Sequence, residues 1–562
     1  MAPSLLALAL ALSTPSVWVA PPDQKLRPDA APQPMRAASL DAGRGECAAF
    51  QVAVRAGDGG LSALGVEAAG FEPELGAKLE LSHEIFVHLD RPSGPEGRAG
   101  DWPDPLVPAV DSFAGERRNA FPVALAPGAL AVVWADVCVP PTAAPGPRRA
   151  ELRLLDGRRE IGRLPVALRV HRFALPATAT LPSSFGLSLL SLEKRHRVTT
   201  PAARAELLRR YALMALRHRI SLHGMSMEPP PYRRTAEGLA LDFRGYDEEL
   251  APLLLGTALP SGARFTTTDL RTAPGLSDPE RESYWRAFAA HLRALGWRGT
   301  LFDYAADEPS PARFPEIVRQ AALVHAADPA IRLLVTVPFQ PALAGSVDVW
   351  APNLNCLAVR RDPKEFCPLR APAGAYAPRL AAGERLWWYV SCSSFGCGGA
   401  IPEKALAYFH GWPSYVIDAP ASRARALGAL AFREGIQGEL YYDTVLAYDD
   451  GDPWQSTYRF GGNGDGTLFY PGTPDRIGGE SEIPIASLRL ELVRLGQQDH
   501  AELTLLARLG DPRLADEVAR GYAPRPDEVD VPPAERERLR RELLARLDAL
   551  WPDGVVRGRS AR

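Results

Sequence analysis

Eight short apolar runs alternate with helical patterns between residues 184 and 443. The runs lie at residues 184–189, 220–223, 263–268, 301–304, 331–336, 347–351, 386–391 and 438–443. Each has the length of a strand, and most are followed by a segment of helical periodicity. Repeated strand–helix units predict a parallel sheet covered by helices. Eight such units predict an α/β fold, a (β/α)8 TIM barrel that we place at residues 183–484.

Two of the expected helices carry start signals. Thr200 is a capping residue followed by Pro201, and Ser277 precedes an Asp-Pro-Glu turn. Gly296 follows the second of these helices, at the position where a left-handed residue commonly ends a helix. These signals place helices after the first and third strands of the expected barrel.

The residues that precede the barrel have the pattern of antiparallel strands. Apolar runs of strand length lie at residues 16–20, 48–54, 131–139, 150–155 and 164–170. Turn pairs such as Pro145-Gly146 and Asp156-Gly157 separate them, so the pattern predicts a β-sandwich over residues 16–175. Residues 173–182 contain two prolines and no helical period, which predicts a linker.

The C-terminal part, residues 485–562, is predicted to be a helical tail. In its last helix an apolar stripe is formed by Leu539, Leu543, Leu547 and Leu550. We expect this stripe to pack on the barrel rather than to wait for a partner.

The fourth run ends at two adjacent carboxylates, Asp307 and Glu308. Successive side chains of a strand point to opposite faces, so both acids can address one pocket only where the strand has ended. Pro309 and Pro311 enforce that break, and Ser310 fits the N-cap of a following helix. The pair is therefore expected at the C-terminal end of a strand, where TIM barrels carry their catalytic groups. Acids beside a helix N-terminus are also common without chemistry, and the spacing alone leaves both interpretations open.

Other strand ends carry side chains typical of a sugar-binding site. Aromatic rings can stack on sugar rings, while amides and carboxylates pair with hydroxyl groups. The candidates are one residue that follows the sixth run and six that belong to the seventh and eighth: Asn353, Trp387, Trp388, Tyr389, Tyr441, Tyr442 and Asp443. They predict a glycan or amino-sugar substrate. Strand alternation also requires that one of the two tryptophans fills the barrel interior.

Several other functions are disfavoured. The net charge of −3 and the pI near 6.4 give no basic face for nucleic acid. The last four cysteines lack a Cys-x-x-Cys pair, and the acidic cluster at 449–452 lacks the spacing of an EF-hand. The glycine-rich run at 461–466 lacks the Lys-Ser/Thr of a P-loop and is predicted to be a turn. We expect no metal and no other cofactor.

Residues 4–12 form an apolar stretch too short to span a bilayer. It has the length of the core of a signal peptide, although no Lys or Arg precedes it, so we expect a signal segment at residues 1–15. No other segment approaches the length of a membrane span. We therefore expect a secreted or periplasmic protein, in which Cys392 can pair with Cys397 across a short loop.

Short motifs in a common order make the chain similar to one enzyme family. They are Glu46-Cys-Ala-Ala-Phe-Gln51, the segments 102–108 and 291–297, Asp307-Glu308-Pro309, the segments 347–352 and 386–389, Tyr470-Pro-Gly472 and the segment 487–499. Together they extend over residues 16–507 and resemble the glycoside hydrolase family 123 β-N-acetylgalactosaminidases and their bacterial homologues. At the eighth strand the sequence departs from the family, reading Tyr441-Tyr-Asp-Thr-Val-Leu in place of a Tyr-Trp-x-Asn type motif.

The resemblance implies a retaining enzyme for β-linked N-acetylhexosamine, above all N-acetylgalactosamine. Glu308 would be the general acid/base, and Asp307 would orient the 2-acetamido group of the substrate, which serves as the nucleophile. Two acids adjacent in sequence suit this scheme, because they are poorly placed to flank a glycosidic bond from opposite sides.

Two other functions stay open at this stage. The altered eighth strand favours a non-catalytic carbohydrate-binding or surface interaction protein on the same fold. A conventional retaining glycosidase is also compatible, with Glu308 paired to another strand-end acid such as Asp443.

Overall fold

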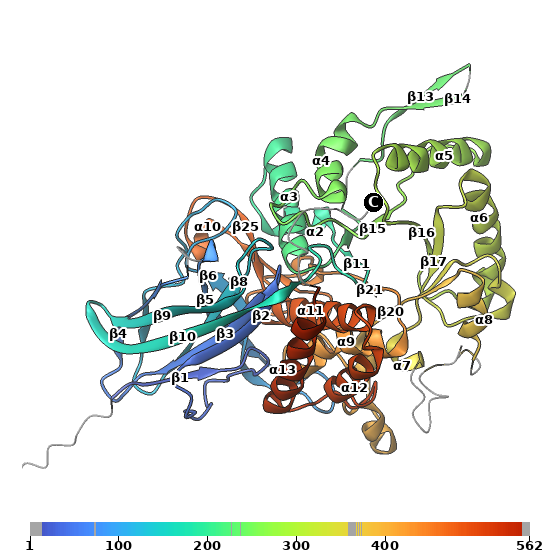
Figure 1. The fold of residues 1–562 in the computed structure, drawn as a ribbon. Coiled ribbons are helices and arrows are strands. Elements are labelled where there is room, and N and C mark those ends of the chain that lie inside the picture. The colour runs from blue at the N-terminus through green and yellow to red at the C-terminus, as the bar shows by residue number, and fades with distance from the viewer. Residues whose placement is uncertain are drawn as a thin grey trace, which may run out of the picture.

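The computed structural model describes residues 14–552 apart from 72–74, 226–227, 237, 358–366, 368, 370 and 372–373. The expected signal segment therefore lies outside the described residues, except for its last two positions. Long antiparallel strands make up one side of the molecule, and a set of short parallel strands with surrounding helices makes up the other (Figure 1). Within the described residues, no helix is long and apolar enough to cross a membrane.

The N-terminal region contains two five-stranded sheets. The first has the order β1 (Ser16–Ala20), β3 (Cys47–Arg55), β8 (Leu130–Cys138), β5 (Glu80–Leu89) and β6 (Gly100–Pro108). The second has the order β2 (Ala38–Arg44), β10 (Arg159–Ala174), β9 (Gly146–Asp156), β4 (Leu61–Ala69) and β7 (Val123–Leu125). Inward residues of both sheets, such as Val52, Val133 and Leu154, form one apolar core.

All five strands predicted in this region are present, and the sequence patterns missed β2, β4, β5, β6 and β7. The sequence pattern did not predict β6 because this strand contains three prolines, at positions 103, 105 and 108. β6 lies at the edge of its sheet. Proline has no N–H to donate, and an edge strand tolerates it because the backbone groups on its outer side have no partner strand. β2 and β7 are also edge strands.

The second half contains two parallel sheets, and every predicted run overlaps a strand in them. One sheet has the order β12 (Leu222–His223), β11 (Ser183–Gly186), β21 (Glu439–Tyr441) and β20 (Trp388–Tyr389). The other has the order β15 (Thr267–Asp269), β16 (Thr300–Ala306), β17 (Arg332–Val335), β18 (Val349–Trp350) and β19 (Arg385–Leu386). β12 contacts β15, and only Trp387 separates β19 from β20, so the two sheets adjoin at both ends.

Helices follow most of these strands. They are α2 (Leu189–Arg195), α3 (Pro201–Arg217), α4 (Arg244–Leu255), α5 (Asp278–Ala294), α6 (Phe314–Ala327), α7 (Leu354–Leu357), α8 (Tyr376–Ala381) and α9 (Ala421–Glu434). The predicted start signals are confirmed: Thr200 caps α3 by accepting from the Ala203 N–H, and Ser277 forms a capping box with Glu280. The hairpin β13 (Tyr232–Thr235) and β14 (Gly238–Leu241) projects from this half (Figure 1).

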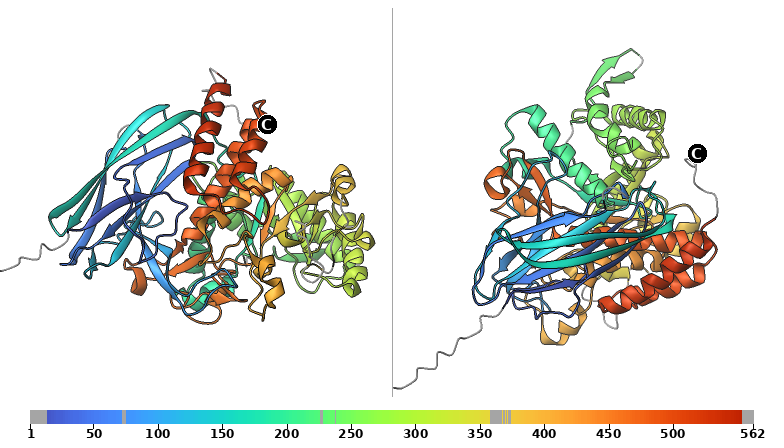
Figure 2. Two further views of the ribbon diagram at one scale, coloured as in Figure 1. Left: turned by 90° about the horizontal axis from the view of Figure 1, so that it is seen from below. Right: turned by 60° about the vertical axis from the view of Figure 1, so that its left-hand side comes forward.

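The C-terminal part begins with β24 (Phe469–Gly472), α10 (Pro474–Ile477) and β25 (Ile483–Ala486) and continues as α11 (Leu488–Arg508), α12 (Pro512–Tyr522) and α13 (Pro533–Leu550). These last three helices lie between the N-terminal sheets and the parallel-sheet half (Figure 2). The stripe on α13 is buried, but not against the barrel strands. It packs on α11, α12, Phe173 at the end of β10 and Leu175 just beyond it. β10 ends at Ala174, so the linker predicted at 173–182 in fact begins with the last two residues of this strand.

Helix α11 joins the two halves through buried ion pairs. Its Arg489 donates to both carboxylate oxygens of Asp104 on β6 at 2.8 Å, and both side chains are fully buried. Arg494, one and a half turns later, donates to Asp136 on β8 at 2.6 Å. Buried pairs of this kind are strongly destabilising to break, because removal of one partner leaves an uncompensated charge. Helix α11 therefore fixes the position of the first N-terminal sheet on the parallel-sheet half.

All six cysteines form disulfides. Cys392 pairs with Cys397, which confirms the short loop closure expected from the sequence. Cys356 pairs with Cys367, and Cys47 on β3 pairs with Cys138, its cross-strand neighbour on β8.

Candidate active site

The acid pair lies at the C-terminal end of β16, as the sequence predicted. β16 ends at Ala306, and Asp307 and Glu308 follow as exposed residues. Glu308 has a left-handed backbone with φ of 40°, so the chain turns between the two acids and the next helix. Ser310 is the N-cap of a short 3-10 turn that leads into α6, although its side chain makes no capping hydrogen bond.

One buried hydroxyl fixes both acids. Thr336, the residue after β17, accepts a hydrogen bond from the Glu308 N–H at 2.7 Å and donates to Asp307 Oδ1 at 2.8 Å. Tyr304, three residues before Asp307, donates to the same oxygen at 2.8 Å. A residue with positive φ persists only where its surroundings stabilise it, and Thr336 supplies that support for Glu308.

The side chain of Glu308 is held separately by Tyr389. The hydroxyl of this residue, at the end of β20, donates to Glu308 Oε1. Burial and the Glu308 charge raise the pKa of Tyr389 well above its usual value, so the phenol stays a donor. Asn353 forms a backbone bridge with Tyr389 and donates to Ser391 Oγ at 2.8 Å. Two of the predicted residues, Tyr389 and Asn353, therefore lie next to each other, and Tyr389 touches the acid pair.

The predicted tryptophans have no exposed ring face. Trp387 is fully buried inside the parallel strands with Phe302 and Leu440, and Trp388 is buried in the surrounding core. Alternation required one of the two to lie inside the strands, and Trp387 does so; Trp388 is buried in the core that includes the surrounding helices. Tyr441 is equally buried and donates to Asp465, so none of these three rings offers a stacking surface.

Asp443 and Tyr442 lie beyond the end of β21 and are only partly buried. The Asp443 carboxylate accepts from the Val445 N–H at 2.7 Å, and burial raises its pKa to about 7. The ring of Tyr442 lies 6.1 Å from that of Phe460, which is 59% exposed. Tyr442 and Phe460 are thus the aromatic pair with access to solvent at this strand end.

Sequence reasoning missed Tyr304, Thr336 and His223. Thr336 was the last residue of a predicted strand, so the strand-end rule could have found it. His223 ends β12, and its ring lies 6.3 Å from that of Tyr304. Burial lowers the pKa of His223, and Ser184 Oγ lies 3.0 Å from its Nδ1. The imidazole therefore stays neutral beside the tyrosine that holds Asp307.

Comparison with solved structures finds a chain of similar overall fold. The chain aligns with a family 123 glycoside hydrolase from Clostridium perfringens, whose structure was solved to describe glycolipid glycan hydrolysis. The alignment covers 96% of this chain and 98% of that one, with 12% identity and a TM-score of 0.64. The fold is similar to that of a family 123 glycoside hydrolase.

Other similarities are weaker. A family 39 glycoside hydrolase from Bacteroides cellulosilyticus WH2 aligns at 13% identity over 75% of this chain and 77% of that one, with a TM-score of 0.30. A GH5 xyloglucanase from Bacteroides ovatus aligns at 10% identity over 86% and 100%, with a TM-score of 0.26. No family model and no curated protein matches the sequence.

The site offers two carboxylates with different surroundings. Asp307 receives two hydroxyl donors on Oδ1, and no hydrogen bond from the described residues reaches its Oδ2. Glu308 receives one donor on Oε1. Each acid is therefore oriented on one oxygen and presents the other, an arrangement suited to hydrogen bonding or proton transfer with a bound molecule.

One group of side chains in the part of the chain that the structure describes has the spacing of a metal site. The one group of His, Cys, Asp and Glu side chains found there with suitable spacing is Cys47, Asp136 and Cys138. The two cysteines of this group are joined to each other, so neither offers a thiolate.

Proposed function

We propose that this chain is a retaining glycoside hydrolase for β-linked N-acetylhexosamine, with N-acetylgalactosamine as the preferred sugar. The observation that carries the proposal is the adjacent acid pair at the end of β16, held from one side by Tyr304, Thr336 and Tyr389. The fold similarity to a family 123 glycoside hydrolase supports it. In this proposal the two parallel sheets form one (β/α)8 barrel, and the two N-terminal sheets form a β-sandwich beside it.

The proposed mechanism uses the substrate's own acetamide as the nucleophile. The free Oδ2 of Asp307 accepts from the acetamide N–H, which orients the carbonyl oxygen toward the anomeric carbon. Glu308 protonates the leaving oxygen through its free Oε2 and then, as a carboxylate, activates the water that opens the cyclic intermediate. Both acids act on the same end of the sugar, as two neighbours in sequence can.

A conventional mechanism with Asp443 as nucleophile has less support. A nucleophilic carboxylate must be ionised, and burial raises the pKa of Asp443 to about 7. Asp443 is better suited to hydrogen bonding a hydroxyl group of the sugar, beside its chain neighbour Tyr442.

The requirement for a 2-acetamido group is the decisive test. The wild-type protein should cleave an aryl β-N-acetylgalactosaminide and leave the matching aryl β-galactoside intact, because only the first carries the nucleophile. A galacto-configured thiazoline, which mimics the cyclic intermediate, should inhibit. Equal cleavage of both substrates would place the nucleophile on the protein, and cleavage of neither would favour the non-catalytic binding protein.

We also propose that the protein is exported to the periplasm or the exterior. Three disulfides support this, because disulfides persist in oxidising compartments. The mature protein should begin shortly after residue 14, and N-terminal sequencing of protein from the native host checks it. Full-length protein in the cytoplasm with six titratable thiols would refute the proposal.

A further inference from the structure

A groove of about 760 Å³ lies between the N-terminal sheets and the parallel-sheet half. One wall consists of the ends of β5, β6 and β8 with the loop at 110–113. The other consists of the end of α3, the loop at 259–263, β25 and the first turns of α11. No function derived above uses this groove.

The groove lies on the face opposite to the acid pair. Residues 218–219 and 263 line it, and they lead into the N-terminal ends of β12 and β15. Asp307 and Glu308 follow the C-terminal end of β16, a parallel neighbour of β15. A strand of seven residues spans about 23 Å at 3.3 Å per residue, so a small sugar cannot occupy both places at once.

A chain of buried polar side chains runs along the floor of the groove. Asp136 accepts from Arg494 at 2.6 Å, and Arg494 pairs with Glu491 at 2.7 Å. Glu491 in turn lies 3.2 Å from His218. Asp136 and Arg494 are 7% and 3% exposed, yet Asp136 Oδ1 and Arg494 Nε have no hydrogen-bond partner among the described residues. Buried polar atoms without partners are rare. Both residues line the groove, although these two atoms themselves are not exposed to it.

The charges of the groove favour a neutral ligand. Arg494 is balanced by Asp136 and Glu491, and Arg219 is occupied by two backbone carbonyls. Glu80 and Arg217 add one further charge of each sign. An anion such as phosphate would be repelled by these carboxylates, whereas a ligand that carries only neutral hydroxyl and amide groups would not.

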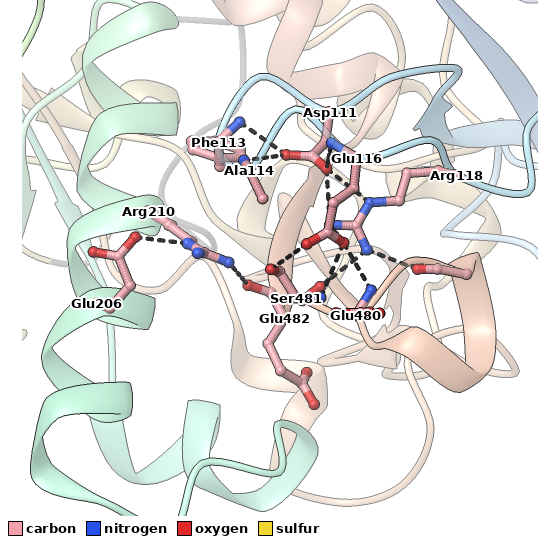
Figure 3. A network of polar contacts seen from close by, with 11 residues as sticks. Asp111, Phe113, Ala114, Glu116, Arg118, Glu206, Arg210, Glu480, Ser481 and Glu482 are labelled. Carbon is pink, nitrogen blue, oxygen red and sulfur yellow. Dashed lines mark hydrogen bonds and ion pairs between the residues drawn. The ribbon is translucent and has the colours of Figure 1, made fainter.

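One wall is preformed and carries an aromatic ring. Figure 3 shows the loop of Phe113 held by the Asp111 carboxylate. This group accepts hydrogen bonds from the N–H groups of Phe113 and Ala114 and from the Arg118 side chain. Arg118 also donates to the carbonyl oxygen of Ser481 at 3.0 Å, in the segment before β25. Phe113 is only partly buried and receives the Arg217 guanidinium 5.3 Å above its ring. A fixed aromatic wall beside hydrogen-bonding groups of both kinds is the chemistry that binds sugar rings.

We infer that this groove is a second, non-catalytic binding site for a neutral oligosaccharide. The site would hold part of a glycan away from the acid pair and so raise the local concentration of substrate chains. The inference rests on the proposed function only for the identity of the sugar, an oligomer of β-linked N-acetylhexosamine.

Calorimetric titration with chitotetraose tests the groove directly. The probe should bind the Glu308→Gln protein, in which turnover is suppressed. Ser261→Trp, which fills the groove from an exposed loop position, should remove the binding event or weaken it about tenfold, and Phe113→Ala should weaken it similarly. Val318→Trp, at an exposed position of α6 outside the groove, is the matched control and should bind as the parent does.

The results separate this inference from the proposed function. Unchanged titrations in both groove variants, with melting temperatures equal to that of the parent, would overturn the groove site. Displacement of the oligosaccharide by millimolar inorganic phosphate would also overturn it, because the groove would then be an anion site. A separate assay tests the active site. Ser261→Trp in the otherwise wild-type protein should cleave a short aryl glycoside at the wild-type rate. If neither the wild-type protein nor Ser261→Trp cleaves that glycoside, while the Glu308→Gln protein still binds chitotetraose in the groove, only the proposed function is contradicted.

Discussion

The N-terminal sheets and the parallel sheets differ in strand length. Strands β8, β9 and β10 run for 9, 11 and 16 residues. The parallel strands have four residues or fewer, apart from β16 with seven. In long strands most backbone N–H and C=O groups form hydrogen bonds within the sheet, and the side chains mainly pack against one another.

Short strands leave more of the chain beyond their ends, where side chains hydrogen-bond to one another. Thr336 and Tyr389 both lie at such ends, and both contact the acid pair. The comparison implies a division of roles. Substitutions at the parallel strand ends should change catalysis with little effect on stability, and substitutions where α11 meets the N-terminal sheets should do the reverse.

The largest effect is expected for Glu308→Gln. Protonation matters most when the leaving oxygen is a poor leaving group, so cleavage of natural glycans should fall by about 10⁴-fold. Much of the activity on an aryl glycoside with a good leaving group should remain. Glu316→Gln, at an exposed position of α6, is the control. An equal loss on both substrates would show that Glu308 is not the acid.

Arg489→Met should have the largest effect on stability. It leaves Asp104 buried without its partner, so the free energy of unfolding should fall by about 3–5 kcal/mol. Arg513→Met breaks an exposed pair with Glu517 and should change stability by less than about 1 kcal/mol. Denaturant unfolding measures both variants. A large loss of kcat in folded Arg489→Met protein would contradict the prediction that the contacts of α11 affect stability and not catalysis.

Asp307→Asn keeps the shape of the side chain and removes its charge. Positive charge develops as the acetamide attacks, so a carboxylate bound to its N–H stabilises the transition state more than the ground state. Loss of this charge should lower kcat by about 10²- to 10³-fold. KM should change little, and a thiazoline should inhibit this variant weakly. The idea fails if a 2-fluoro sugar instead labels Asp443 or another acid covalently.

Thr336→Val removes the hydroxyl that fixes both acids. We expect kcat to fall by about 10- to 100-fold, because misplacement of a catalytic group by a fraction of an ångström is costly. Thr336→Ser keeps the hydroxyl and should restore most of the rate. Steady-state kinetics with both variants at equal melting temperature distinguishes positioning from a general loss of structure, which would affect the serine variant too.

The last prediction concerns how the stability of the N-terminal region depends on pH. Glu84 on β5 is fully buried, its two carboxylate oxygens have no partner among the described residues, and burial raises its pKa to about 8. The folded state therefore binds a proton that the unfolded state releases near pH 4.5, and stability should fall as the pH rises from about 4.5 to 8. Glu84→Gln should flatten this slope in thermal melts. If the dependence of stability on pH is the same in Glu84→Gln, groups other than Glu84 cause it.

Much of the architecture follows from local pattern. The eight apolar runs overlap all nine parallel strands, since β19 and β20 share one run, and caps such as Thr200 and Ser277 predicted where helices begin. The proline-bounded acid pair was found for the same reason, since a strand must end where prolines and a helix start follow it.

The sequence by itself thus determined the order and type of most elements and the strand end that carries Asp307 and Glu308. Only the tertiary structure decided their partners: Thr336 is 28 residues from Glu308, and Tyr389 is 81 residues away. It also decided that Trp387 and Trp388 are both buried and that α13 packs on α11, α12 and β10. Local periodicity fixes which face of an element is apolar, whereas contacts between distant residues depend on sheet order and register, which no single segment encodes.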